Sequence, residues 1–259
     1  MTLLSANLGF LWKDRSLPNA IRAAKAAGFD AVECHWPYEE DAGAVKAALE
    51  ETGLRMLGLN TVKGPRDGDT GLAAQPGRED EARKAIDQAF DYGVEIGAGA
   101  VHVMAGGSGP DEAASMASFA ANLGHACDRA RDAGMTALIE PLNPYDNPGY
   151  FLIGFEKAKR VLDAVGRDEL KIMFDCYHLQ ITDGDLLRRF RNNLDIVGHV
   201  QFAGVPDRGE PDRGEVAYDR LLPAIADAGF SGPFGAEYKP TGETDASLRW
   251  MHAFRKDTT

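Results

Sequence analysis

The chain has 259 residues, of which 44% are hydrophobic and 26% charged, and its formal net charge is −12. This composition predicts a folded chain with a large core rather than a disordered one. The acidic balance argues against nucleic acid and against an anionic membrane surface as partners. No apolar run approaches the roughly 20 residues of a membrane span, and the amino terminus lacks the pattern of a signal peptide.

The three cysteines, Cys34, Cys127 and Cys176, lack the spacing of a metal site and cannot all pair with one another. Reduced thiols are the simplest interpretation, and they are typical of the cytoplasm, where we expect the protein to be located. If the strand that contains Asp175 continues by one residue, Cys176 points to its other face and packs in the core.

Short apolar segments alternate with amphipathic segments along the whole chain. Strands are predicted at residues 3–6, 29–34, 54–59, 100–104, 136–140, 170–174, 196–200 and 233–236. Helices are predicted at residues 17–27, 41–51, 79–96, 111–133, 155–165, 184–193, 218–228 and 244–254. Eight strand–helix units imply an α/β fold with parallel strands closed into a (β/α)8 TIM barrel, which usually takes about 250 residues.

We therefore expect residues 1–259 to form a single TIM-barrel domain. An open doubly wound sheet is the alternative, but the sequence has no Gly-x-Gly-x-x-Gly motif after its first predicted strand. Residues 61–78 form a long segment without a predicted helix or strand, and they include Lys63 and several glycines. Such segments in compact domains are usually functional or disordered, and we interpret this one as a lid over a pocket.

Side chains with oxygen ligands end four consecutive predicted strands: Glu140, Asp175, Gln201 and Glu237. In a closed barrel the carboxyl ends of the strands meet at one mouth, where enzymes of this fold place their active sites. Three carboxylates and an amide oxygen suit Mg²⁺ or Mn²⁺ better than zinc, and a cation would offset the repulsion among the acids. One acid at a strand end is commonly a solvated terminus or a helix cap, but chance does not readily place four on successive strands.

Two histidines, His178 and His199, lie within three residues of these predicted ligands. A lone histidine is more often structural, but this placement favours contact with the ligands or polarisation of a substrate oxygen. His35 and His102 follow the second and fourth predicted strands, and they either line the same mouth or have structural roles.

Basic residues in the loops after strands three, seven and eight are within reach of a substrate carboxylate. They are Lys63, Arg66, Arg208, Arg213 and Lys239. The alternative for each is an ordinary solvated surface position. Arg208 and Glu210 either tie their loop to the site or pair with each other. Asn7 and Asn60 end the first and third strands and are further candidates for substrate contact.

Five short motifs carry a resemblance to a known family. They are Glu-Pro-Leu-Asn at 140–143, Phe-Asp-Cys-Tyr-His at 174–178, Gly-His-Val-Gln at 198–201, Arg-Gly-Glu-Pro at 208–211 and Gly-Ala-Glu-Tyr-Lys-Pro at 235–240. In these motifs the chain resembles hydroxypyruvate isomerase, a family of xylose-isomerase-like barrels, and 2-oxo-tetronate isomerases share nearly the same motifs. The resemblance implies a divalent metal on Glu140, Asp175, Gln201 and Glu237. It also implies acid–base catalysis by Glu140 and Glu237.

The resemblance further implies a metal-dependent isomerisation of hydroxypyruvate, a small anionic hydroxy-keto acid, to tartronate semialdehyde. In this hypothesis the metal holds the carbonyl and hydroxyl oxygens and stabilises an enediolate, while the two glutamates transfer the proton between C3 and C2. Alternatives are 2-oxo-tetronate isomerisation, ketose 3-epimerisation, a metal-dependent endonuclease, and a barrel that binds a sugar acid without turnover. The sequence leaves the exact substrate, the native metal and the oligomeric state open, and a homo-oligomer is compatible with it.

Overall fold

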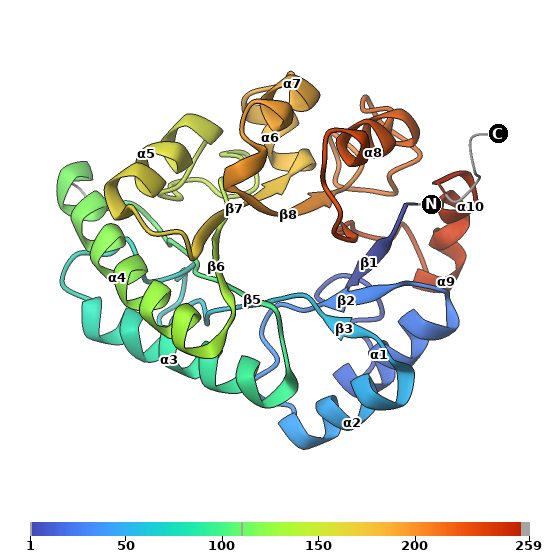
Figure 1. Cartoon of the computed structure of the whole chain (residues 1–259), viewed down its shortest axis with the longest axis horizontal. Coiled ribbons are helices and arrows are strands. Elements are labelled where there is room, and N and C mark those ends of the chain that lie inside the picture. The colour runs from blue at the N-terminus through green and yellow to red at the C-terminus, as the bar shows by residue number, and fades with distance from the viewer. Residues whose placement is uncertain (1, 110, 255–259) are drawn as a thin grey trace.

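The computed structural model describes residues 2–109 and 111–254, and its strands form a closed parallel barrel (Figure 1). The strand order is β3-β2-β1-β9-β8-β7-β6-β5-β4. The strands are β1 (Leu4–Asn7), β2 (Ala31–Glu33), β3 (Arg55–Met56), β4 (Leu59–Asn60), β5 (Ala100–His102), β6 (Thr136–Ile139), β7 (Leu170–Asp175), β8 (Val197–Phe202) and β9 (Phe234–Ala236). The chain thus has the (β/α)8 TIM-barrel fold expected from its sequence. Residues 1, 110 and 255–259 of the expected 1–259 domain lie outside the described residues.

Strands β3 and β4 are two pieces of the single strand predicted at residues 54–59. The ladder is interrupted at Leu57 and Gly58, yet the backbone stays bonded to both neighbouring strands. The Leu57 N–H donates to the Val32 carbonyl of β2 (2.7 Å), and the Gly99 N–H, next to β5, donates to the Met56 carbonyl (3.0 Å). The two ends of the strand order therefore meet in one segment, and nine named strands fill eight positions of the barrel.

The helices surround the strands on the outside (Figure 1). They are α1 (Leu17–Ala26), α2 (Ala42–Thr52), α3 (Glu79–Ile96), α4 (Glu112–Ala133), α5 (Phe155–Val165), α6 (Cys176–Thr182), α7 (Leu186–Arg191), α8 (Tyr218–Asp227), α9 (Thr244–Ser247) and α10 (Met251–Phe254). Local capping sets their ends. Asp111 caps α4 by accepting the Ala113 and Ala114 N–H groups, and Gly134 ends it with a left-handed backbone (φ 65°).

Two helix predictions were wrong in detail. The single helix predicted at residues 184–193 is α7, and an additional helix, α6, precedes it. Helix α6 begins directly after β7 because the Asp175 carboxylate accepts the Tyr177 N–H (2.8 Å) as its N-cap. Cys176 therefore opens a helix rather than continuing the strand, although it is buried as expected. The closing helix predicted at residues 244–254 is divided into α9, a 3₁₀ turn and α10.

Alternation along the strands separates an apolar outer face from a more polar interior. The outward side chains pack against the helices in the main core and include Leu4, Val32, Val101, Ile139 and Phe174. The interior contains a cavity of about 320 Å³, whose lining includes Glu33, Ala100, His102, Leu138, His199 and Gln201. Large side chains usually fill the interior of such barrels. Here polar groups and open space lie beneath the carboxyl-end mouth.

The predicted irregular segment 61–78 contains no named helix or strand, and it ends in a buried arginine. The Arg78 guanidinium donates to both carboxylate oxygens of Asp69 (2.7 and 2.9 Å), to Glu81 (2.7 Å) and to the Gln75 side-chain oxygen (2.8 Å). We call Asp69, Gln75, Arg78 and Glu81 the Arg78 cluster. These bonds hold the end of the segment to the start of α3, and its role as a lid stays a prediction.

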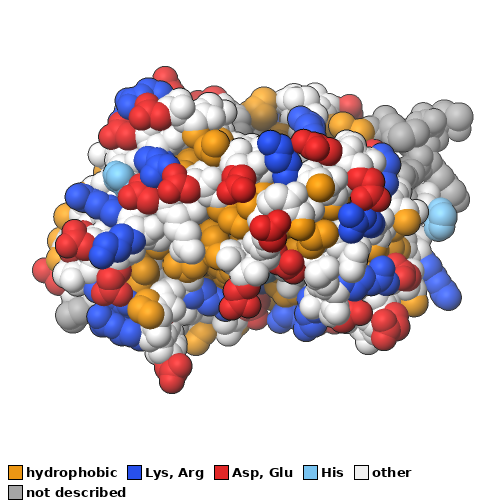
Figure 2. Space-filling view, turned by 90° about the horizontal axis from the view of Figure 1, so that it is seen from below, with side chains coloured by type: hydrophobic (Ala, Val, Ile, Leu, Met, Phe, Trp, Pro, Cys, Tyr) orange, Lys and Arg blue, Asp and Glu red, His pale blue; other side chains and the backbone are white. Residues whose placement is uncertain are grey.

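The side of the molecule in Figure 2 carries acidic and basic side chains interspersed with hydrophobic ones. That face has no broad basic surface of the kind that binds a nucleic-acid backbone. Within residues 2–109 and 111–254, none of the helices combines the length and the apolar character needed to cross a membrane.

Candidate active site

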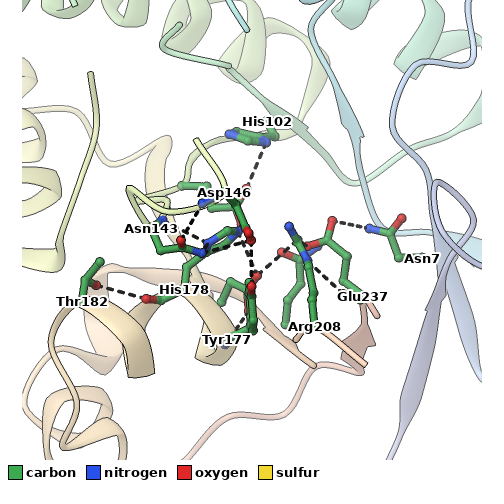
Figure 3. Close-up of polar contacts among 12 residues, drawn as sticks. Asn7, His102, Asn143, Asp146, Tyr177, His178, Thr182, Arg208 and Glu237 are labelled. Atoms are coloured by element: carbon green, nitrogen blue, oxygen red, sulfur yellow. Dashed lines mark hydrogen bonds and ion pairs between the residues drawn. The ribbon is translucent and has the colours of Figure 1, made fainter. Parts of the chain in front are cut away.

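The four predicted cation ligands lie at the carboxyl ends of adjacent strands. Glu140 directly follows β6, Asp175 ends β7, Gln201 lies in β8 and Glu237 directly follows β9. Asp175 and Gln201 are register partners across β7 and β8, so their side chains start side by side. All four side chains are buried. The barrel topology thus collects residues that are almost 100 positions apart in the sequence, and part of the resulting group is shown in Figure 3.

His178 lies between two of the acids. Its Nε2 is 3.6 Å from Asp175 Oδ2 and 3.8 Å from Glu140 Oε1. Its Nδ1 accepts the backbone N–H of Asn143 (3.0 Å), which places the proton of the neutral ring on Nε2. Burial, with a further contribution from Arg208, lowers the pKa of His178 to about 3, so the ring is neutral at pH 7. His178 therefore directs an N–H donor into the site, which suits contact with a substrate oxygen better than cation binding.

Glu237 lies among donors from three other parts of the chain, of which Figure 3 shows Asn7 and Arg208. Its Oε1 accepts from the Asn7 side-chain amide (2.9 Å) and contacts His35 Nε2 (2.9 Å). Its Oε2 forms a close ion pair with Arg208, whose guanidinium also lies 3.7 Å from Asp175 Oδ2. Asn7 and Arg208 were both predicted as site residues, and His35 was considered as one that lines the mouth.

His102 approaches the same group from β5. Its Nδ1 lies 3.6 Å from Glu140 Oε2, and the ring is buried. Burial lowers the pKa of His102 to about 4, so it too is neutral at pH 7. Of the two interpretations open for His35 and His102, the structure favours the one in which both line the mouth.

Glu33 was not predicted as a site residue, and the structure places it within the same network. Glu33 ends β2 and is buried, and its Oε1 accepts from the side-chain amides of Gln201 (2.9 Å) and Asn7 (3.2 Å). Its Oε2 contacts His199 Nε2. One signal for it was available, because Glu33 ends the second strand as Glu140 and Glu237 end later ones.

Glu140, Asp175 and Glu237 all lie within the influence of the positive charge of Arg208. Burial, and then the charges of Glu237 and Asp175, raise the pKa of Glu140 well above its ordinary value. Burial also raises the pKa of Asp175 to about 7, although Arg208 opposes the shift. For Glu237 burial acts in the same direction, but Arg208 and His35 outweigh it and lower the pKa to about 2. The guanidinium of Arg208 therefore does not neutralise all three carboxyl groups.

The donor set fits a divalent cation. Among the described residues, Glu140 Oε1, Asp175 Oδ2 and Gln201 Oε1 are buried and have no hydrogen-bond partner. Buried polar atoms are rarely left in this state. Atoms of Glu140, Asp175 and His178 lie within 4.8 Å of one another, so a cation held by the two acids would lie next to His178. Carboxylate and amide oxygens of this kind are ligands that Mg²⁺ and Mn²⁺ prefer.

The other predicted substrate contacts lie farther out. The Lys63 ammonium is exposed and lies over the Trp36 ring, 4.2 Å from its centroid. Glu210 accepts the Thr241 N–H (3.0 Å) and hydroxyl (2.6 Å), so it ties its loop to the loop after β9. Lys239 is exposed, and its backbone N–H donates to the Arg208 carbonyl (2.7 Å).

Asn60 lines the interior cavity, and its carbonyl accepts the Tyr38 hydroxyl. The two remaining basic candidates have partners elsewhere. Arg66 pairs with Glu81, and Arg213 pairs with Glu210. The structure thus brings Asn7, His178, His199 and Arg208 into contact with the acids and places the other candidates around them.

Comparison with known proteins supports the fold and shows the family. The family model described as "Xylose isomerase-like TIM barrel" matches residues 21–254. The 2-oxo-tetronate isomerase of Cupriavidus necator is 39% identical over 257 residues, which cover 98% of this chain and 99% of that protein. The hydroxypyruvate isomerase of Escherichia coli is 34% identical over 258 residues, which cover 98% of this chain and all of that protein.

Among solved structures, one described as AP endonuclease, family 2 from Brucella melitensis matches with a TM-score of 0.93 and 35% identity. The match covers 99% of this chain and 100% of that chain. Barrel enzymes place their active sites at the carboxyl-end mouth, which is where this chain has its buried acids and histidines. The chain belongs to the hydroxypyruvate isomerase family of xylose isomerase-like TIM barrels, and it is an isomerase. The resemblance seen in its motifs is thereby confirmed.

Proposed function

We propose that this isomerase interconverts hydroxypyruvate and tartronate semialdehyde with the help of one divalent cation, Mg²⁺ or Mn²⁺. The observation that carries the proposal is a set of buried oxygens on Glu140, Asp175 and Gln201 that have no hydrogen-bond partner among the described residues and lie in the same mouth as Glu237. The name of the Escherichia coli relative supports hydroxypyruvate as the substrate.

In this proposal Glu140, Asp175, Gln201 and Glu237 hold the cation. When bound, it would polarise the substrate's carbonyl and hydroxyl oxygens and supply positive charge opposite the enediolate. Asp175 suits the position because its Oδ1 is already fixed by the Tyr177 N–H while its Oδ2 has no hydrogen-bond partner within the described chain. The cap of α6 thus orients the ligand.

The reaction moves one proton from C3 of hydroxypyruvate to C2, and a second proton between the two neighbouring oxygens. We assign the carbon-bound proton to Glu140 and Glu237, one of which removes it from C3 while the other returns one to C2. Both carboxyls are buried, which keeps water away from the enediolate. His178, through its Nε2–H, holds a substrate oxygen and assists the transfer of the hydroxyl proton.

Arg208 pairs with Glu237 and lies close to Asp175, and we assign it to the substrate carboxylate. Its side chain is 11% exposed, and the guanidinium packs over the rings of Phe10 (4.8 Å) and Tyr177 (5.1 Å). Stacking on two rings fixes the guanidinium plane, which favours bidentate binding of a carboxylate. A small anionic substrate can thus be attracted although the chain as a whole is acidic.

A second candidate substrate is 2-oxo-tetronate, because the Cupriavidus necator relative is named for it and is 39% identical to this chain. It also presents a carboxylate and a neighbouring keto group, so the same side chains would serve it. A coupled assay should compare the two substrates, and free ketohexoses, at equal concentrations with metal-free protein and with added Mg²⁺ or Mn²⁺. We expect metal-dependent turnover of hydroxypyruvate with the highest kcat/KM. A higher value for 2-oxo-tetronate would move the assignment to that substrate.

Two outcomes would refute the proposal as a whole. Binding of a sugar acid without conversion, with affinity unchanged in Glu237→Gln, would indicate a binding protein. Cleavage of abasic DNA without turnover of either acid would indicate the endonuclease activity that the name of the Brucella melitensis structure suggests. The net charge of −12 weighs against that activity.

A further inference from the structure

Gln201 differs from the other three proposed ligands because its two terminal atoms are chemically distinct. Either oxygen of a carboxylate can bind a cation, whereas an amide can do so only through Oε1. A rotation of 180° about the last side-chain bond would present the NH₂ group instead and repel a cation. Whether Gln201 is a ligand therefore depends on what fixes its amide.

Glu33 fixes that orientation. Its Oε1 lies 2.9 Å from Gln201 Nε2, and a carboxylate can only accept at this distance. The reverse orientation would bring Gln201 Oε1 against the carboxylate and leave the NH₂ group facing the cation ligands. In the observed arrangement Gln201 Oε1 is buried and has no hydrogen-bond partner within residues 2–109 and 111–254.

Glu33 is itself held from two sides. Asn7 donates to its Oε1 (3.2 Å) and also to Glu237 (2.9 Å), while Asn7 Oδ1 accepts the Gly9 N–H (2.9 Å). His199 contacts its other oxygen. These bonds leave the carboxylate little freedom to turn away from the Gln201 amide.

The neighbouring strand leaves room for this arrangement. A Cβ atom at Gly235 in β9 would lie 2.5 Å from Glu33 Oε1, 2.9 Å from Gln201 Cγ and 2.9 Å from His199 Nε2. No real Cβ atom tolerates such contacts, so a side chain at this position would displace the Glu33–Gln201 pair. Three strands, β2, β8 and β9, therefore shape the same contact.

We propose that Glu33 is a positioning residue that selects the cation-binding orientation of the Gln201 amide. The inference rests on the cation site proposed above and adds a residue to it. Glu33 acts through Gln201, so its loss should weaken cation binding while the fold and the other three ligands are retained. Partners that orient metal ligands typically contribute about 10- to 100-fold in affinity.

The test is a double-mutant cycle read by Mn²⁺ binding, with free Mn²⁺ measured by electron paramagnetic resonance. Metal-free wild type, Glu33→Gln, Gln201→Glu and the double variant are compared. In Glu33→Gln the new amide can pair with either orientation of Gln201, so we expect about 10- to 100-fold weaker binding. In the Gln201→Glu background both terminal atoms are oxygens, so the same Glu33→Gln change should not weaken binding.

The cycle separates orientation from charge. If Glu33 acted only as a negative charge, Glu33→Gln would weaken binding equally in both backgrounds, which would overturn the inference. A merely structural role would lower the unfolding temperature of the metal-free variant and leave Mn²⁺ affinity unchanged, which would also overturn it. Glu79→Gln is the matched control, since Glu79 accepts from Ser118 and Gly77 outside the site.

Failure of the inference can be told from failure of the proposed function. If wild type binds no Mn²⁺, the cation site and the inference are both wrong. If wild type binds Mn²⁺ and Glu33→Gln binds it equally well, only the role of Glu33 is wrong. If Glu33→Gln does not fold, the comparison of Gln201→Glu with the double variant decides, because stronger or equal binding by the double variant supports the orienting role and weaker binding contradicts it.

Discussion

Two buried charged groups in this molecule contrast with each other. In the Arg78 cluster, the guanidinium donates four hydrogen bonds to Asp69 and Glu81, and a fifth goes to Gln75. At the barrel mouth, Arg208 faces several carboxylates, and some buried oxygens there have no hydrogen-bond partner among the described residues. All three guanidinium nitrogens of Arg78 thus have hydrogen-bond partners, whereas buried oxygens at the mouth lack them among the described residues.

The pKa values show the same contrast. Hydrogen bonds from Arg78 lower the pKa of Asp69 and of Glu81. Burial and neighbouring acids instead raise the pKa of Glu140. Ion pairs of this kind fix a loop in place. Buried acids with raised pKa values are instead typical of functional sites, and here they are suited to binding a cation. The contrast therefore marks the Arg78 cluster as structural and the mouth as functional.

The largest expected effect is the loss of turnover when an acid at the barrel mouth is replaced. Glu237→Gln should lower kcat by about 10²- to 10⁴-fold, because the variant loses one of two acid–base groups. Thermal unfolding should show an intact fold, since Gln occupies the same volume. Steady-state kinetics with hydroxypyruvate and Mn²⁺ measure the effect, with Glu79→Gln as the control. A variant that keeps near-normal turnover would remove Glu237 from the mechanism.

Arg78→Met removes the guanidinium at the centre of the Arg78 cluster. This change leaves Asp69 buried without its partner, so the free energy of unfolding should fall by about 3 kcal/mol, at the lower end of the range for breaking a buried ion pair. Urea denaturation measures it. Arg66→Met is the control, because Arg66 is mostly exposed where it pairs with Glu81, and should change stability little. Equal stability of both variants would show that the cluster does not anchor the segment.

A smaller loss is expected for His178→Gln. The variant loses the Nε2–H donor but keeps Glu140 and Asp175, so kcat should fall by about 10²-fold, at the lower end of the range for such groups. Mn²⁺ affinity should stay close to that of wild type, because the proton on Nε2 makes His178 a donor rather than a ligand. Loss of Mn²⁺ binding in this variant would instead identify His178 as a cation ligand.

The last prediction concerns the pH dependence of cation binding. Asp175, with a pKa of about 7, holds a proton in the metal-free protein at pH 5, and the raised pKa of Glu140 favours a proton there as well. A cation must displace these protons, so Mn²⁺ affinity should rise between pH 5 and pH 8, by about tenfold per pH unit for each proton released. Calorimetry in buffers of different ionisation enthalpy counts the protons. An affinity that is flat over this range would show that the acids are already ionised.

Most of the fold could be predicted because each strand and helix carries a local signal. The alternation of apolar strands and amphipathic helices located β7, α3 and α5 closely. The interruption of the third strand at Leu57 and Gly58 could not be predicted in this way, because it concerns pairing with strands that are distant in the sequence, β2 for β3 and β5 for β4. Helix α6 was missed since its cap, Asp175, was interpreted only as a strand end.

The site was partly predictable for the same reason. Glu140, Asp175, Gln201 and Glu237 stand out because they repeat one local pattern, an acid or amide at the end of a strand. Glu33 has the same pattern, but its significance lies in contacts with residues 166 and 168 positions away, which no local signal reveals.

The central claim is that the buried oxygens at the mouth hold one cation that the isomerisation requires. Its most direct test is to titrate metal-free protein with Mn²⁺ while bound metal and conversion of hydroxypyruvate are measured in the same samples. The account predicts negligible conversion without metal and a rate that rises in proportion to bound Mn²⁺ up to one ion per chain. Full conversion by the metal-free protein, or Mn²⁺ binding that leaves the rate unchanged, would contradict it.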